Sequence, residues 1–118
     1  LQACGRDGNC GVILIDDALF TRNLERIVAL TREYRVPAMY TNQGYVITYG
    51  ALIAYGVGLA DLYGQAMEYV DKLLNGAKAA DLPVQMPATF RLAVSLPAAA
   101  AIGVEVPPDI LAITDRVV

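Results

Sequence analysis

The sequence predicts an α/β fold of three layers, in which a mostly parallel sheet lies between helices on both faces. A short apolar run at 12–15 ends in two acidic residues, which is typical of a buried strand in a parallel sheet. Apolar residues at helical spacing follow at 23–34, and strand-like and helix-like segments alternate along the rest of the chain. Because parallel strands joined by helices make right-handed crossovers, this alternation favours a layered sheet.

Each element of the N-terminal half follows from a local pattern. We expect strands at 12–15, 36–40 and 51–55 and a helix at 23–34. The first strand, 12–15, is expected to be buried on both faces because its apolar run is continuous. Residues 41–44 form a polar turn, and 45–49 fits either a short helix or an extended segment.

The C-terminal half begins with the strongest predicted helix, at 59–74. Asp61 lies in its first turn, and Asn75 and Gly76 follow as a stop signal. The segment 90–96 alternates with period two, which indicates a half-buried strand. Pro97 can open a short helix through an alanine run, and a last helical turn is expected at 109–112.

Length and composition limit the domain organisation. The chain has 118 residues, of which 56% are hydrophobic and 18% charged, so most of it is not disordered. We expect a flexible N-terminal segment at 1–11 and a single α/β domain at 12–118. Cys4 and Cys10 can close a small disulfide loop, although two free thiols near a frayed terminus are favoured. No second ligand pair follows them, so neither zinc nor another metal is expected.

Several classes of function are disfavoured by the same composition. A net charge of −3 argues against nucleic-acid binding. The longest uncharged run, between Arg35 and Asp61, contains Pro37 and four glycines, so it does not predict a membrane-spanning helix. The first residues include neither Met nor an apolar run, so we expect no signal peptide in this chain, and a mature or truncated chain or a fragment.

Candidate chemistry gathers where the predicted strands end. Asp16 and Asp17 follow the first strand, as the acidic pair of a two-component receiver domain does, but the third strand ends without a phosphoacceptor Asp. An acidic pair that caps the next segment is the simpler interpretation. Four tyrosines also lie near strand ends, where they can stack on a ligand or donate hydrogen bonds to it; they are Tyr40, Tyr45, Tyr49 and Tyr55.

No nucleophile and base can be paired in this sequence. Ser95 is the one serine, and the chain has no histidine to activate it. The Gly56-Val57-Gly58 turn lacks the third glycine of a dinucleotide-binding fingerprint, and Asp61 at that position would repel a phosphate. The sequence therefore predicts a binding module, not an enzyme, with no cofactor.

Two long segments carry a family resemblance. "VPAMYTNQGYVITYGALIAYG" and "ADLYGQAMEYVDKLLNGAKAADLPVQMPATFRLAVSLPAAAAIGVEVPPDILA" resemble the periplasmic substrate-binding proteins of ABC transporters. The similar subfamily includes members associated with aromatic amino acids such as tryptophan. The resemblance covers about nine tenths of the chain, from residue 12 onward, and only the last third or so of the family's two-lobed fold.

The resemblance implies a fold and a role. It implies one lobe of a type I binding protein plus a tail that crosses the hinge, and a small molecule, such as an amino acid, held in the cleft between lobes. It also implies an ABC permease as partner and an extracytoplasmic location. The matching site positions are Asp16, Asn42, Gln43, Tyr55 and Asp61.

Alternatives stay open at this point. The chain can instead be a receiver-like signalling domain without catalysis, or a truncated remnant without a transport role. If the first lobe is absent, the apolar side of the helix at 59–74 needs another partner, which predicts a homo-oligomer.

Overall fold

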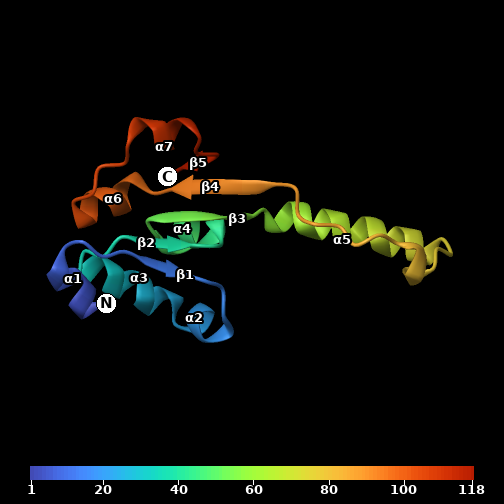
Figure 1. Ribbon diagram of the computed structural model, residues 1–118, viewed down its shortest axis with the longest axis horizontal. Helices are drawn as coiled ribbons and strands as arrows, with labels where there is room; N and C mark the ends of the chain where they lie inside the picture. The colour runs from blue at the N-terminus through green and yellow to red at the C-terminus, as the bar shows by residue number, and fades with distance from the viewer. The chain divides into compact units, whose positions relative to one another are not determined.

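The computed structural model describes the backbone of residues 1–118 and every side chain except that of Asp7. Five strands form one sheet in the order β1-β2-β3-β4-β5; they are β1 (Val12–Leu14), β2 (Ala38–Tyr40), β3 (Ile53–Val57), β4 (Phe90–Val94) and β5 (Arg116–Val117) (Figure 1). The helices are α1 (Gln2–Asp7), α2 (Ala18–Arg22), α3 (Leu24–Glu33), α4 (Gln43–Tyr49), α5 (Leu59–Leu74), α6 (Leu96–Ile102) and α7 (Pro108–Ala112), with a 3-10 turn at Ala79–Asp81.

The sheet is mixed, with mostly parallel pairings. β1, β2 and β3 run parallel, and so do β4 and β5. The Ser95 amide, just after β4, donates to the Leu52 carbonyl, just before β3, at 2.9 Å, so β4 runs opposite to β3. Helices lie on both sides of the sheet, which confirms the predicted α/β class.

The chain divides into two compact units. The first consists of residues 1–56 and 91–118 and holds the core, while the second is 57–90. The buried cluster of the first unit consists of Leu24, Val28, Ala38, Tyr40, Val46, Ala51, Ala54 and Ala93. Helix α3 supplies Leu24 and Val28 at positions four residues apart, which is the spacing that places two side chains on one helix face.

The expectation that the first strand is buried on both faces is wrong. Val12 and Leu14 pack against the core, but the Ile13 side chain is 71% exposed. Ile13 lies beside Met39, which lies beside Ile53, so these three side chains share one face of the sheet. An open hollow of about 340 Å³ lies over this face. Burial depends on which segments pack on a strand, and the strand's own composition does not contain that information.

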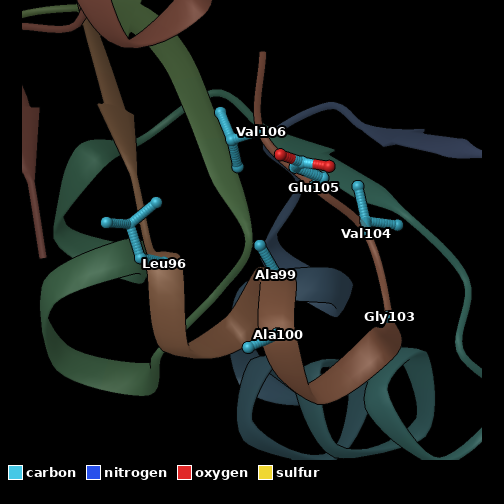
Figure 2. A pocket seen from close by; sticks show the side chains of 7 residues that line it. All are labelled: Leu96, Ala99, Ala100, Gly103, Val104, Glu105 and Val106. Carbon is cyan, nitrogen blue, oxygen red and sulfur yellow. The ribbon is translucent and has the colours of Figure 1, made fainter. Parts of the chain in front are cut away.

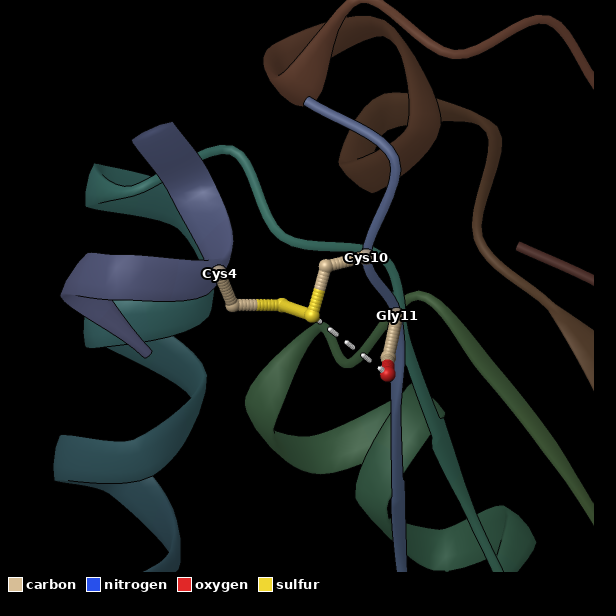
Figure 3. The surroundings of a disulfide bond; sticks show 3 residues. All are labelled: Cys4, Cys10 and Gly11. Carbon is tan, nitrogen blue, oxygen red and sulfur yellow. Dashed lines mark hydrogen bonds between the residues drawn. A yellow bond between two sulfur atoms is a disulfide. The ribbon is translucent and has the colours of Figure 1, made fainter. Parts of the chain in front are cut away.

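The N-terminal segment contains a helix and a disulfide bond. Cys4, in α1, is bonded to Cys10, and their Cα atoms are 5.2 Å apart (Figure 3). The expectation of two free thiols is therefore wrong. Gly5 lies against the end of α3, since a Cβ there would come within 2.4 Å of the Tyr34 carbonyl oxygen. The bond links α1 to the residues that lead into β1, where the sequence indicated no regular element.

The second unit is built on α5, which spans the predicted residues 59–74. Asn75 ends the helix, and its side-chain amide donates to the Asp71 carbonyl at 2.9 Å. The Tyr69 hydroxyl donates to the Pro83 carbonyl, which holds the segment after the helix against it. None of the residues of α5 is buried, and among its apolar side chains Leu74 is 82% and Met67 64% exposed.

Besides α1, two more elements of the first unit were not expected from the sequence. Helix α2 is a five-residue turn that follows the acidic pair, and β5 is a two-residue strand held by β4. Both are too short to produce a periodic pattern. No helix in the part of the chain that the structure describes is long and apolar enough to cross a membrane.

Candidate functional site

The candidate site lies where β1 and β2 end. Parallel strands present their carboxyl ends at one edge of a sheet, and the loops that follow them collect the ligand-binding groups of such folds. β1 leads to Asp16 and Asp17, and β2 leads to Thr41 and Asn42. Each loop then enters a short helix, α2 or α4, so both loops are anchored at each end.

The two neighbouring aspartates do different things. The Asp17 side chain accepts a hydrogen bond from the Leu19 amide at 2.8 Å and so caps α2, as the capping interpretation predicted. Asp16 is exposed, and its Oδ1 accepts a hydrogen bond from the Tyr45 hydroxyl at 2.9 Å. The other oxygen of Asp16 accepts no hydrogen bond from any described residue. Asp16 therefore keeps a charged oxygen that can bind a ligand.

Tyr45 joins the two loops. It lies in α4, and its hydroxyl is 3.5 Å from the Thr21 hydroxyl of α2 as well as 2.9 Å from Asp16. Thr21 lowers the pKa of the Tyr45 phenol, but burial and the hydrogen bond and charge of Asp16 raise it, and the net pKa lies above the usual value. The sequence placed Tyr45 among four tyrosines near strand ends but gave no reason to single it out.

The β2–α4 loop presents polar atoms without partners. The Asn42 side chain accepts a hydrogen bond from the Gly44 amide at 2.8 Å and caps α4, so its oxygen is already used. By contrast, Thr41 Oγ1 and Gln43 Nε2 are shielded from solvent and have no hydrogen-bond partner among the described residues. Buried polar groups are nearly always paired in native proteins, so two unpaired ones in one loop need an explanation. Thr41 was absent from the predicted site residues.

A third unpaired polar atom belongs to Tyr40, the last residue of β2, in the core. Tyr40 is 1% exposed, and its hydroxyl also has no partner within the described chain. The nearby Thr31 hydroxyl donates to the Val28 carbonyl at 2.9 Å instead. Burial raises the pKa of the Tyr40 phenol, and Thr31 and the positive charge of Arg32 offset that rise in part.

The end of β3 comes very close to this loop. A Cβ on Gly56 would lie 1.9 Å from the Thr41 carbonyl oxygen, so only glycine fits there. The adjacent Tyr55 is 47% exposed. Asp61 is half-buried and lies in α5, within the second unit, whereas the other four predicted residues belong to the first. Of the predicted residues, Asp16 is thus hydrogen-bonded to Tyr45 of α4, the helix that Asn42 caps.

Another hollow exists away from these loops. It has a volume of about 420 Å³ and is lined by α6 and the residues after it; they are Leu96, Ala99, Ala100, Gly103, Val104, Glu105 and Val106 (Figure 2). The Glu105 carboxylate is the one charged group in an otherwise apolar lining. Binding sites for polar small molecules combine several convergent polar groups, which this hollow does not offer. Within the described residues, no group of three or more acidic or cysteine side chains can hold a metal ion.

Comparison with solved structures finds the same fold in three bacterial proteins. A conserved domain protein from Vibrio cholerae matches 99% of this chain with a TM-score of 0.86 and 22% identity. The ABC domain in complex with L-Trp from Streptococcus pneumonia matches 96% with a TM-score of 0.82 and 19% identity. A substrate-binding protein with adhesive properties from Clostridium difficile, in a ligand-free open structure, matches 89% with a TM-score of 0.62 and 24% identity.

These matches cover only part of the similar proteins. This chain spans 39%, 38% and 35% of their respective lengths. A search of curated proteins gives no significant match. The family model for ABC transporter substrate-binding proteins matches residues 2–118. The match extends over nearly the whole sequence and agrees with the fold, and it favours this family over the receiver-like alternative. The chain belongs to the family of ABC transporter substrate-binding proteins.

Proposed function

We propose that this chain binds a small-molecule solute, an amino acid by class, at the edge where β1 and β2 end. The observation that carries the proposal is the unpaired state of Thr41 Oγ1 and Gln43 Nε2 at the start of α4, the helix whose Tyr45 binds Asp16, an aspartate that keeps a charged oxygen. A solute with matching groups satisfies all three. Such groups cost free energy while they stay unpaired and lower it when a ligand pairs with them.

The chemistry of an amino acid fits this set. Asp16 can bind the ammonium group, and the Thr41 hydroxyl and the Gln43 amide can donate to the carboxylate. Asn42 contributes by holding the loop, since its oxygen already caps α4. Tyr55, with 47% of its side chain exposed, is proposed to contact the apolar part of the solute. The tryptophan-bound relative supports this class of ligand.

The role in transport rests on the family. In the whole protein we propose that solute binds in a cleft between two lobes and passes to an ABC permease for uptake. We also propose an extracytoplasmic location. The Cys4–Cys10 disulfide supports it, because disulfides form and persist in oxidising compartments.

Binding without catalysis is the role that the side chains support. Ser95 is 3% exposed, and its hydroxyl accepts a hydrogen bond from the Ala98 amide at 3.2 Å, so it serves as the cap of α6. A serine used in this way has no base beside it in a sequence without histidine. We therefore propose that the chain is not an enzyme and needs no cofactor.

Self-association of the isolated chain remains part of the proposal. The apolar side chains of α5 lack a buried environment; Leu59, Leu62, Val70 and Leu73 are 39–46% exposed. A face of this kind favours association with another protein surface. Light scattering on the 118-residue chain is expected to show a homo-oligomer, and a monomer at high concentration contradicts this part.

The test of the solute proposal is a thermal-shift screen with amino acids, aromatic acids and small sugars. The 118-residue chain is compared with a version extended upstream to the start of the gene. A ligand that binds only the native state raises the unfolding midpoint by mass action. We expect amino acids to stabilise the extended protein, with a smaller shift or none for the shorter chain, because half of a cleft buries less of the solute.

Variants make the screen specific. Replacing Thr41 by Val removes a hydroxyl while keeping its shape, and should abolish most of the shift. The matched control is Thr114→Val, whose hydroxyl donates to the Ile110 carbonyl, away from the 41–43 loop. If neither protein responds to any compound, the transport role is withdrawn and the chain is treated as a remnant. If sugars alone stabilise the protein, the amino-acid class is wrong.

A further inference from the structure

We infer that Tyr45 is the positioning residue that fixes Asp16 to bind the cationic group of the solute. The inference rests on the proposed function and adds to it a residue that the family resemblance did not supply. Asp16 lies in an exposed loop, and an exposed carboxylate samples several rotamers unless a neighbour holds it. The Tyr45 hydroxyl, 2.9 Å from Asp16 Oδ1, is such a neighbour.

The direction of this hydrogen bond is fixed by the surrounding groups. The Thr21 hydroxyl donates its one hydrogen to the Asp17 carbonyl at 2.9 Å. The Tyr45 hydrogen points to Asp16, at 2.9 Å, in preference to the Thr21 oxygen at 3.5 Å. A hydrogen bond from a neutral donor to a carboxylate is stronger than one between neutral groups. Asp16 therefore gains a fixed orientation and keeps its other oxygen.

Tyr45 can act in this way because its own ring is fixed. The ring meets that of Tyr40 edge to face, with centroids 6.3 Å apart and an interplanar angle of 86°. Tyr40 is 1% exposed, and Val46, the next residue of α4, is fully buried. The core thus sets the position of α4 and of the Tyr45 ring. The Tyr45 hydroxyl is held in place in this way, and it in turn restrains Asp16 in the loop that follows β1.

The arrangement also predicts which part of a solute is selected. A carboxylate with one oxygen fixed and the other available binds an ammonium group more strongly than a mobile one, because less conformational entropy is lost on binding. Nothing in this contact recognises the rest of the solute. The affinity for a solute with a charged amine is therefore expected to depend on Tyr45. The affinity for a solute without an amine is expected to be independent of Tyr45.

The experiment uses four variants of the protein that responds in the screen above. They are Tyr45→Phe, Asp16→Asn, the double variant, and Tyr49→Phe as a control. Phenylalanine keeps the ring contacts of Tyr45 and removes only its hydroxyl. Tyr49 lies on the same helix and contacts the Tyr45 ring at 6.4 Å between centroids, but its hydroxyl makes no hydrogen bond with any residue described in the structure.

Two ligands distinguish the positioning of Asp16 from a general loss of protein stability. They are L-tryptophan and 3-(indol-3-yl)propionate, which lacks the amine. We expect Tyr45→Phe to weaken tryptophan binding roughly fivefold and Asp16→Asn to weaken it more than tenfold. Binding of the propionate should not change. Tyr45→Phe should have no further effect on top of Asp16→Asn, because it acts through that carboxylate.

A measurement without ligand tests the contact itself. In a pH titration of the tyrosine signals, Asp16→Asn should lower the pKa of Tyr45, because the carboxylate raises it. The inference is overturned if Asp16→Asn leaves the pKa of Tyr45 unchanged. It is also overturned if Tyr45→Phe weakens tryptophan binding by the same factor in the unmodified protein and in the Asp16→Asn variant. Equal binding of both probes by the unmodified protein also overturns it while leaving solute binding intact. If no amino acid stabilises the protein in the screen, the amino-acid proposal fails, and with it the selection role of Tyr45.

Discussion

Replacing Gly56 by alanine should destabilise the protein through a single backbone contact. An alanine Cβ would lie 1.9 Å from the Thr41 carbonyl oxygen and 2.9 Å from its carbon, whereas ordinary contacts begin at 3.4 Å. The two strand ends would therefore have to separate by 3.4 − 1.9 = 1.5 Å. Both partners are backbone atoms, so no side-chain rotation can relieve the clash.

The size of the effect follows from that displacement. Overpacking in a rigid region costs about 1–3 kcal/mol, and a clash between two backbone segments belongs at the upper end, at about 3 kcal/mol. For a domain of this size, a loss of 1 kcal/mol lowers the unfolding midpoint by about 4 °C, so a loss of about 3 kcal/mol is expected to lower it by about 12 °C. The displaced Thr41 should also weaken solute binding.

The assay is thermal unfolding followed by near-ultraviolet circular dichroism. Five of the seven tyrosines lie in the first unit, and Tyr63 and Tyr69 lie in the second. The near-ultraviolet signal of the tyrosines therefore reports mainly the unit that contains Gly56. The matched control is Gly64→Ala in α5, where a Cβ meets nothing within 4 Å. That change should stabilise the helix by about 0.5–1 kcal/mol. A Gly56→Ala variant as stable as the unmodified protein would refute the close approach of the two strand ends.

Three further predictions concern features described above. Reducing the Cys4–Cys10 bond, or changing both residues to serine, should lower the free energy of unfolding by about 2 kcal/mol, and equal urea midpoints with and without reductant would contradict this. Asp17→Ala should cost about 1 kcal/mol through loss of the α2 cap, whereas Asp16→Ala should cost less, as urea titrations of both will show. Tyr40→Phe should not destabilise the protein at neutral pH, because it removes a buried hydroxyl that has no partner. The pKa of Tyr40 is higher in the folded protein than in the unfolded chain, so the unmodified protein loses stability as the pH rises from about 10 through the folded pKa. The Tyr40→Phe variant should lose less stability over this pH range. Equal losses of stability in the two proteins would contradict this.

Local signals predicted the longer elements well. Helix α5 begins and ends where the 3.6-residue period and the Asn75-Gly76 stop indicated. The ambiguous segment 45–49 became helical because Asn42 caps it and Val46 is buried in the core. Periodicity could not decide this, since a short segment takes the conformation that its tertiary contacts favour.

The candidate site was predicted in part. The expectation that ligands bind where parallel strands end predicted Asp16 and the 41–43 loop, because such strands bring their carboxyl ends to one edge of the sheet. It did not show that Asp17 caps a helix while Asp16 does not, and the resemblance added Asn42, whose oxygen caps α4 in the structure. Thr41 was missed because a hydroxyl becomes conspicuous only when the fold buries it without a partner.

The sequence by itself determined the order of the longer elements, the α/β class and the family, because periodicity, caps and long ordered motifs are local properties of the chain. The tertiary structure alone decided which side chains meet. The contact between Tyr45 and Asp16 spans 29 residues, and the Thr41–Gly56 approach joins two strand ends. The exposure of Ile13 was likewise decided by which segments pack on β1. Contacts between distant residues depend on how whole elements pack, and no local pattern contains that information.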